Sequence, residues 1–254
     1  MESALCSCFD APLEWRDGNY VFAFDEPVVD AQERIDRLCA LMEPAVTCSI
    51  RWARQNQQDW LSQYRQSVQP VRCGGFWVRP SWHEGAQDGL IDVVIDPGLV
   101  FGTGHHETTC GCLEALAGLE LRNKRLIDVG CGSGILAIAA ARRGALVSLC
   151  DTDKAAIIDS RHNCEINGVK PEELWVGSAD QSERTYEIVV ANIVADVLVF
   201  LRQDLERITQ TGGYLILSGV LNRYKSRIEG AYKAFETIHV IERGEWLTFV
   251  LKKI

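Results

Sequence analysis

A glycine-rich turn flanked by two carboxylates gives this chain its clearest capacity for chemistry. The stretch Asp128-Val-Gly-Cys-Gly-Ser-Gly134 follows an apolar run and precedes a helical pattern. Its three glycines, Gly130, Gly132 and Gly134, permit a tight turn and a close approach of the backbone to a ligand. Asp151 ends the next apolar run, where a carboxylate binds ribose hydroxyls in doubly wound sheets. These residues predict a site for a nucleoside-containing ligand.

The spacing of the glycines distinguishes between two kinds of cofactor. A dinucleotide fingerprint requires a third glycine at the position of Ile135, so an NAD-dependent dehydrogenase is only a minor alternative. Asp128 adds a carboxylate at the end of the first strand, where it would attract the positive sulfonium and amino groups of S-adenosylmethionine. The combination is typical of class I methyltransferases.

Two further polar positions fall where such a fold places its ligand. Asn192 ends a later strand and is expected to face the crevice at the carboxyl edge of the sheet. Its amide oxygen, or a neighbouring main-chain carbonyl, could accept a hydrogen bond from an attacking amine, although an Asx turn that caps the next helix is an open alternative. Thr108 and Thr109 follow the Gly-rich stretch that begins at Asp96, in the first turn of a predicted helix, where hydroxyls and free amides face outward.

The elements that must position these residues follow from the hydrophobic pattern. Near-continuous apolar strands alternate with amphipathic helices from residue 85 onward, which predicts a parallel sheet covered on both faces. The last two strands are close enough for a hairpin, so one edge strand should run antiparallel. The expected strands are 91–95, 126–129, 146–150, 173–176, 187–191, 214–218, 237–241 and 246–251, and the expected helices are 107–118, 134–143, 154–167, 194–209 and 222–231.

The predicted fold class is therefore α/β: a doubly wound, Rossmann-like, mostly parallel seven-stranded sheet with one antiparallel edge strand, plus a small α+β N-terminal domain. The N-terminal pattern holds a strand at 20–24, a helix at 29–42 and a strand at 46–53. We expect a small recognition domain over 1–54, a linker region over 55–84 and a methyltransferase domain over 85–254.

The composition limits the partners, the metal content and the location that we expect for this chain. The chain has 254 residues, with 26 Lys and Arg against 35 Asp and Glu, a formal charge of −9 that disfavours direct nucleic-acid binding and permits a cationic partner. No apolar run approaches the length of a membrane span, and we see no signal peptide. The ten cysteines form no C-x-x-C pair, and His105 and His106 are adjacent, so we expect reduced, mostly buried thiols, no metal site and a cytoplasmic location.

Several longer stretches resemble one known family. DPGLVFGTGHHETT, IDVGCGSGILAIAA, CDTD, VVANIVA and GGYLILSGVL are similar to sequences of the ribosomal protein L11 methyltransferase (PrmA) family. Asp59-Trp60 and Pro80-Ser81-Trp82 resemble the linker region of that family, so the similarity covers roughly residues 55 to 254. The resemblance implies methyl transfer from S-adenosylmethionine to lysine ε-amines, the α-amine, or both, of a ribosomal protein, by an enzyme that we expect to be a monomer.

The resemblance also implies a set of site residues. Cofactor contacts are expected at Phe101, Gly102, Thr103, Thr109, Asp128, Gly130, Gly132, Gly134, Asp151 and Asn192, and Asn192 is expected to orient the amine. This chain departs from the family pattern at His105 and Glu107, which replace a Thr and a Pro, and its N-terminal region is short. His105, His106 and Glu107 are candidates for a general base by position only.

Two alternatives stay open at this stage. The chain could be a methyltransferase of the same fold that acts on another protein or on a small molecule, which the short N-terminal region would favour. It could also be a cofactor-binding module without turnover, against which the intact glycine turn, Asp151 and Asn192 argue.

Overall fold

The computed structural model describes residues 13–16, 19–22, 30–40, 68–86, 89–96 and 106–254, and the chain divides into two compact units, Met1–Ser62 and Gln63–Ile254. In the first unit, strands β1 (Leu13–Arg16) and β2 (Asn19–Phe22) form an antiparallel hairpin, and helix α2 covers Ala31–Ala40. The predicted strand at 20–24 and helix at 29–42 correspond to β2 and α2, and β1 was not predicted. The predicted strand at 46–53 lies outside the described residues.

The second unit is built on a seven-stranded sheet with the order β11-β12-β10-β9-β6-β7-β8. Its strands are β6 (Arg125–Val129), β7 (Leu146–Asp151), β8 (Glu173–Val176), β9 (Tyr186–Asn192), β10 (Thr209–Leu221), β11 (Phe235–Arg243) and β12 (Trp246–Lys253). The chain proceeds outward from β6 to β8 and then returns to the other side of β6 with β9. The carboxyl ends of β6 and β9 therefore border the switch point at which open α/β sheets bind ligands.

The doubly wound, Rossmann-like sheet predicted from the sequence is confirmed, including its reversed strand. The strands from β8 to β10 pair in parallel, whereas β12 pairs antiparallel with both β10 and β11. The reversed strand is β12, which lies next to the edge because its hairpin partner β11 folds back outside it.

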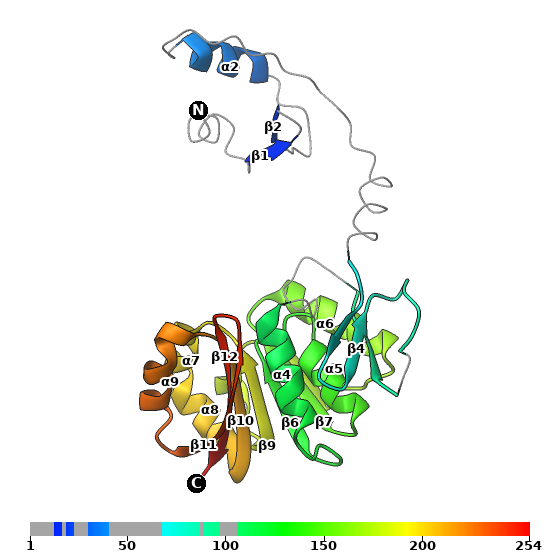
Figure 1. Ribbon diagram of the computed structural model, residues 1–254, viewed down its shortest axis with the longest axis vertical. Helices are drawn as coiled ribbons and strands as arrows, with labels where there is room; N and C mark the ends of the chain where they lie inside the picture. Colours follow the sequence, from blue (N-terminus) through cyan, green and yellow to red (C-terminus); the bar gives the residue numbers. More distant parts are fainter. Residues whose placement is uncertain (1–12, 17–18, 23–29, 41–67, 87–88, 97–105) are drawn as a thin grey trace. The chain divides into compact units, whose positions relative to one another are not determined.

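Helices cover both faces of this sheet, as Figure 1 shows. One face carries α4 (Glu107–Ala117), α5 (Ile135–Arg142) and α6 (Lys154–Ile166), and the other carries α7 (Ala195–Phe200), α8 (Arg202–Ile208) and α9 (Lys225–Ala231). Successive residues of one strand enter opposite cores: Leu126 packs in the first and Ile127 in the second. This two-sided burial explains why the strands lack polar alternation. The helix predicted at 194–209 is split, because Leu201 has a ψ of 0°.

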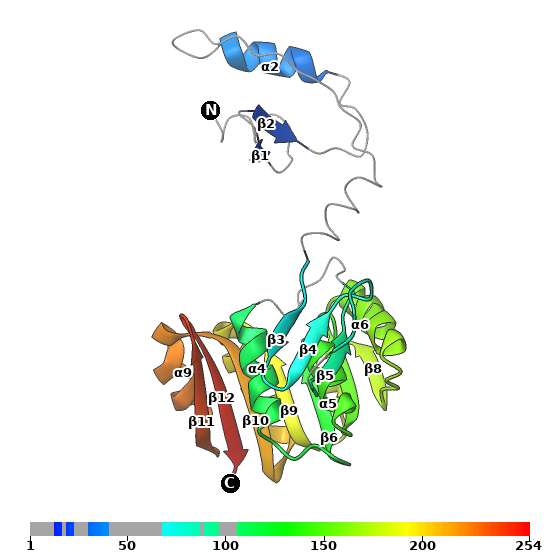
Figure 2. The same ribbon diagram turned by 45° about the vertical axis from the view of Figure 1, so that its right-hand side comes forward.

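A second, three-stranded sheet lies over the layer of α4 and α5 (Figure 2). Strands β3 (Val71–Cys73) and β4 (Phe76–Arg79) form a hairpin, and β5 (Ile91–Val94) pairs in parallel with β4. Phe76, Val78 and Val93 are buried in the same core as α4 and α5. Strands β3 and β4 belong to the segment 55–84, which we expected to be a linker region. The proposed boundaries between recognition domain, linker region and methyltransferase domain, at residues 54 and 84, stay a prediction.

Two of the cysteines lie side by side. The packing of β3 on α4 brings the Cα atoms of Cys73 and Cys110 to 5.1 Å, a separation that a disulfide can span. Cys112, Cys131, Cys150 and Cys164 are free thiols and are buried, as expected. Within the described part of the chain, no helix has both the length and the apolar character needed to cross a bilayer.

Candidate active site

The glycine turn joins the carboxyl end of β6 to the start of α5. Gly130, Gly132 and Gly134 all have left-handed backbones, with φ of +71°, +51° and +79°. A Cβ on Gly134 would lie 3.1 Å from the Ser160 Cβ and 3.2 Å from Leu149 Cδ2, so this position excludes larger residues by both its conformation and its surroundings. The turn required by the sequence motif is therefore present.

Asp151, at the end of β7, is bound directly to this turn. Its Oδ2 accepts a hydrogen bond from the Gly132 N–H at 2.9 Å, and its Oδ1 accepts one from the Asp153 N–H at 2.9 Å. A carboxylate offers about four lone-pair sites, so Asp151 can still accept hydrogen bonds from a ligand's hydroxyls. Asp153 in turn caps α6 by accepting from the Ala155 N–H at 2.8 Å.

Asp128 has a different environment from Asp151. Its side chain is 1% exposed, and its Oδ2 accepts a hydrogen bond at 3.2 Å from the N–H of Ala137, in the first turn of α5. Burial, together with the nearby charge of Asp151 and against the opposing effect of the Ala137 hydrogen bond, raises the pKa of Asp128 to about 8. Asp128 thus caps α5 from inside the protein, and a cationic ligand in the crevice would favour its ionised form.

The first turn of α4 lies against the carboxyl end of β9. Asn192 Nδ2 donates to Thr108 Oγ1 at 3.2 Å and to Thr109 Oγ1 at 3.4 Å. Both threonines are almost fully buried. Within the described residues, Asn192 Oδ1 has no hydrogen-bond partner, so its acceptor remains available. The structure therefore brings Thr109 and Asn192 together, and the alternative of an Asx cap is not seen, because α7 begins without a side-chain cap.

Ile193 connects the glycine turn to the pair formed by Thr109 and Asn192. A Cβ on Gly130 would lie 2.9 Å from Ile193 Cδ1, so the residue after Asn192 packs directly on the glycine turn. The turn with Asp151 and the pair Thr109 and Asn192 therefore border one region of the sheet edge. Phe101, Gly102, Thr103 and His105 lie outside the described residues, and their roles stay predictions.

His106 and Glu107 form the N-terminal end of α4. His106 Nδ1 accepts a hydrogen bond from the Thr108 N–H at 3.3 Å and lies 2.8 Å from Thr108 Oγ1. Its ring packs edge-on against Trp246, with ring centroids 5.1 Å apart. His106 therefore caps the helix, whereas a role as general base stays untested. Across the described ranges, no cluster of His, Cys, Asp and Glu could hold a metal ion.

Sequence reasoning missed two hydroxyls that support this arrangement. Ser218 Oγ of β10 donates to the Thr108 carbonyl at 3.2 Å and lies 2.7 Å from Thr248 Oγ1 of β12. Both side chains are buried, so they anchor the first turn of α4 on the sheet. The sequence did contain a signal for them, because Ser218 and Thr248 are hydroxyl residues within otherwise apolar runs of β10 and β12.

The sheet order with its reversed β12, the glycine turn after β6 and the carboxylate after β7 define a class I S-adenosylmethionine-dependent methyltransferase. The model of one family, ribosomal protein L11 methyltransferase (PrmA), matches residues 13–254, and the chain belongs to that family. The match extends the resemblance found in the sequence, which began near residue 55.

Individual relatives agree with this assignment. A ribosomal protein L11 methyltransferase of a Nitratiruptor species is 40% identical over 256 residues, which cover 99% of this chain and 91% of that protein. One of Wolinella succinogenes is 46% identical over 205 residues, covering 81% and 74%. A crystal structure of a ribosomal protein L11 methylase from Lactobacillus delbrueckii subsp. bulgaricus has a TM-score of 0.66 and 27% identity, covering 70% of this chain and 95% of that one.

Proposed function

We propose that this enzyme transfers methyl groups from S-adenosylmethionine to lysine ε-amines, to the α-amine, or to both, of ribosomal protein L11. The names of the relatives support this acceptor. The observation that carries the chemistry is the position of Asn192, whose Nδ2 is held by Thr108 and Thr109 while its Oδ1 remains available at the sheet edge.

The cofactor supplies a methyl group on a positively charged sulfur. In this proposal, the backbone of Gly130, Gly132 and Gly134 gives it a close approach, and Asp151 accepts its ribose hydroxyls. Asp128 supplies negative charge from beneath the turn, while Thr109 borders the site from α4. Phe101, Gly102 and Thr103 complete the set predicted from the sequence.

Asn192 has the task of orienting the acceptor amine. A lysine must lose a proton before it attacks, and its ordinary pKa is about 10.4. A dry site beside a cationic sulfur lowers that pKa, because both effects disfavour a second positive charge. Asn192 Oδ1 then accepts a hydrogen bond from the neutral amine and directs its lone pair toward the methyl carbon, so the protein contributes mainly alignment.

The same proposal includes the roles of the three segments of the chain, its location and its partners. Residues 1–54 would recognise the ribosomal protein, residues 55–84 would connect, and residues 85–254 would hold the cofactor. The chain would act as a cytoplasmic monomer, and its net charge of −9 would disfavour direct binding of nucleic acid while permitting a cationic protein acceptor.

Labelling with tritiated S-adenosylmethionine tests the acceptor. Purified ribosomal protein L11 and a whole-cell lysate are incubated separately with the full chain, and the labelled proteins and residues are identified. Label on amines of L11 in both samples is expected. Label on another acceptor, with none on L11, would favour a different methyltransferase of this fold, and binding without any transfer would contradict an enzymatic role.

A further inference from the structure

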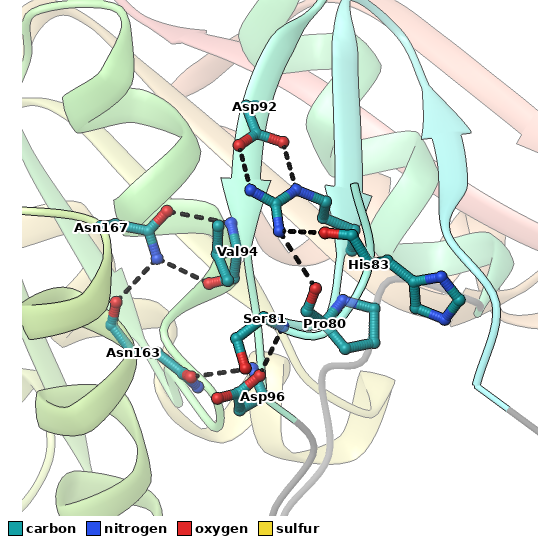
Figure 3. A network of polar contacts seen from close by, with 9 residues as sticks. Pro80, Ser81, His83, Asp92, Val94, Asp96, Asn163 and Asn167 are labelled. Atoms are coloured by element: carbon teal, nitrogen blue, oxygen red, sulfur yellow. Dashed lines mark hydrogen bonds and ion pairs between the residues drawn. The ribbon is translucent and has the colours of Figure 1, made fainter. Parts of the chain in front are cut away.

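Helix α6 lies along the free edge of strand β5 (Figure 3). The N–H groups of Ile91 and Ile95 bond to the carbonyls of Gly75 and Arg79 on the β4 side, so the backbone groups of Val94 face the opposite edge. Asn167, at the end of α6, pairs with both of them: its Oδ1 accepts from the Val94 N–H at 2.9 Å and its Nδ2 donates to the Val94 carbonyl at 2.6 Å. One carboxamide thus replaces a neighbouring strand.

Asn163, one helical turn earlier, joins the same edge to a different part of the molecule. Its Oδ1 accepts a hydrogen bond from the Asp96 N–H at 3.0 Å, and its Nδ2 donates to the Ser133 carbonyl at 2.9 Å. Asn163 and Asn167 are four residues apart in the chain, and their partners Asp96 and Val94 are two residues apart. Four residues of helix and two residues of extended chain each span about 6 to 7 Å, so each asparagine lies opposite its own partner. Asn163 is therefore bonded at both ends of its carboxamide.

The Ser133 carbonyl belongs to the glycine turn. Ser133 lies between Gly132 and Gly134 and is 4% exposed, and Asn163 is 1% exposed, so this bond is shielded from water. Helix α6 also touches the turn through Ser160, whose Cβ would be 3.1 Å from a Cβ on Gly134. The turn is thus held from β7 by Asp151 and from α6 by Asn163. A carbonyl left without its donor in such a place is costly, which favours one conformation of the turn.

We propose that Asn163 is a positioning residue for cofactor binding. Its carboxamide fixes the glycine turn and links it to Asp96, the residue that opens the DPGLVFGTG stretch. This role rests on the proposed function, which assigns the cofactor to that turn. Asn163 acts through Ser133 and Asp96, because its carboxamide bonds to the backbone of these two residues.

The test compares two alanine variants of the full chain by calorimetric titration with S-adenosylmethionine. Asn163→Ala and Asn167→Ala each remove a carboxamide that joins α6 to β5, but only Asn163 bonds to the turn. Asn163→Ala is expected to weaken binding by about tenfold or more, and Asn167→Ala by less than about threefold. In turnover assays, the KM for the cofactor rises in Asn163→Ala while the KM for the protein acceptor stays unchanged. Equal losses in both variants would overturn the positioning role.

A third variant tests the donor function of Asn163 directly. In Asn163→Asp the introduced carboxyl resembles the carboxamide only when protonated, since it then has one O–H donor and one acceptor. Its affinity relative to the native chain at the same pH should recover as the pH falls from about 8 to about 5.5, because burial raises the pKa of the introduced group. A ratio that does not change with pH would contradict the donor role.

Asp151→Ala separates failure of this inference from failure of the proposed function. If Asp151→Ala binds S-adenosylmethionine like the native chain, the cofactor does not use this turn and both proposals fail. If Asp151→Ala binds weakly while Asn163→Ala binds normally, the cofactor site is right and only the role of Asn163 is wrong.

Discussion

The carboxylate of Asp151 accepts a hydrogen bond from the backbone N–H of Gly132, with 2.9 Å between Oδ2 and the nitrogen. The residue expected to bind the ribose therefore also holds the glycine turn in place. We predict that Asp151→Ala weakens S-adenosylmethionine binding by about a hundredfold, because it removes a charged acceptor and loosens the turn. Calorimetric titration measures the loss.

A matched control is available two residues further along. Asp153 caps α6 through the Ala155 N–H, so Asp153→Ala should lower the free energy of unfolding by about 1 kcal/mol. Its affinity for the cofactor should stay within about threefold of the native value. If both variants lost affinity equally, the effect of Asp151 would be one of local stability.

The buried carboxyl of Asp128 predicts a pH dependence of stability. Its pKa is raised to about 8 in the folded chain from an ordinary value of 3.8. The folded state therefore binds the extra proton, so the stability contributed by protonated Asp128 is complete below pH 4 and is lost as the pH rises toward 8. Each unit of pKa difference corresponds to about 1.4 kcal/mol.

Replacement by an uncharged isostere tests this expectation. Asp128→Asn should lose less stability than the native chain between pH 5 and pH 8, by a few kcal/mol in the free energy of unfolding measured by urea denaturation without cofactor. Parallel stability curves of the two proteins across this range would mean that Asp128 is ionised throughout.

Two glycines with positive φ, one in the glycine turn and one after α6, predict a graded effect on stability. Gly134 and Gly168 both have positive φ, +79° and +66°, but only Gly134 has neighbours where a Cβ would be placed. Gly168→Ala should therefore lower the free energy of unfolding by about 1 to 2 kcal/mol from backbone strain alone. Gly134→Ala should cost about 1 to 3 kcal/mol more, since Ser160 must move. Equal losses would show that the contact with α6 carries no strain.

Much of the fold was predictable because apolar strands and amphipathic helices alternate regularly along most of the second unit, Gln63–Ile254. Its strands are buried on both faces, so the apolar runs around Ile127 and Val189 stand out from the amphipathic helices between them. Strands β3 and β4, of three and four residues, escaped prediction because they lie outside the alternation of strands and helices from which the similarly short β5 and β8 were predicted. Their place over α4 and α5 is fixed by long-range packing of Phe76 and Val78, which a local pattern does not contain.

The arrangement of the candidate site was predictable in part. Glycines with a required backbone conformation and polar residues at strand ends are local signals, and they led to the prediction of Gly134, Asp151 and Asn192 as site residues. The support for these residues is not local: Ser218 holds Thr108 across 110 residues of sequence, and Asn163 reaches Ser133 across 30. Such partners are defined only when helices and strands pack, so single-sequence reasoning had no means of selecting them.

Single-turnover kinetics of Asn192→Ala, with saturating S-adenosylmethionine and ribosomal protein L11 as acceptor, tests the central claim most directly. We predict that the methyl-transfer rate falls by about a hundredfold because the amine loses its alignment. The Kd of the cofactor should stay within a few-fold, since Gly130, Gly132, Gly134 and Asp151 are unchanged. Methyl transfer at the native rate in this variant, with the cofactor bound, would contradict the assigned role of Asn192 and the account of catalysis built on it.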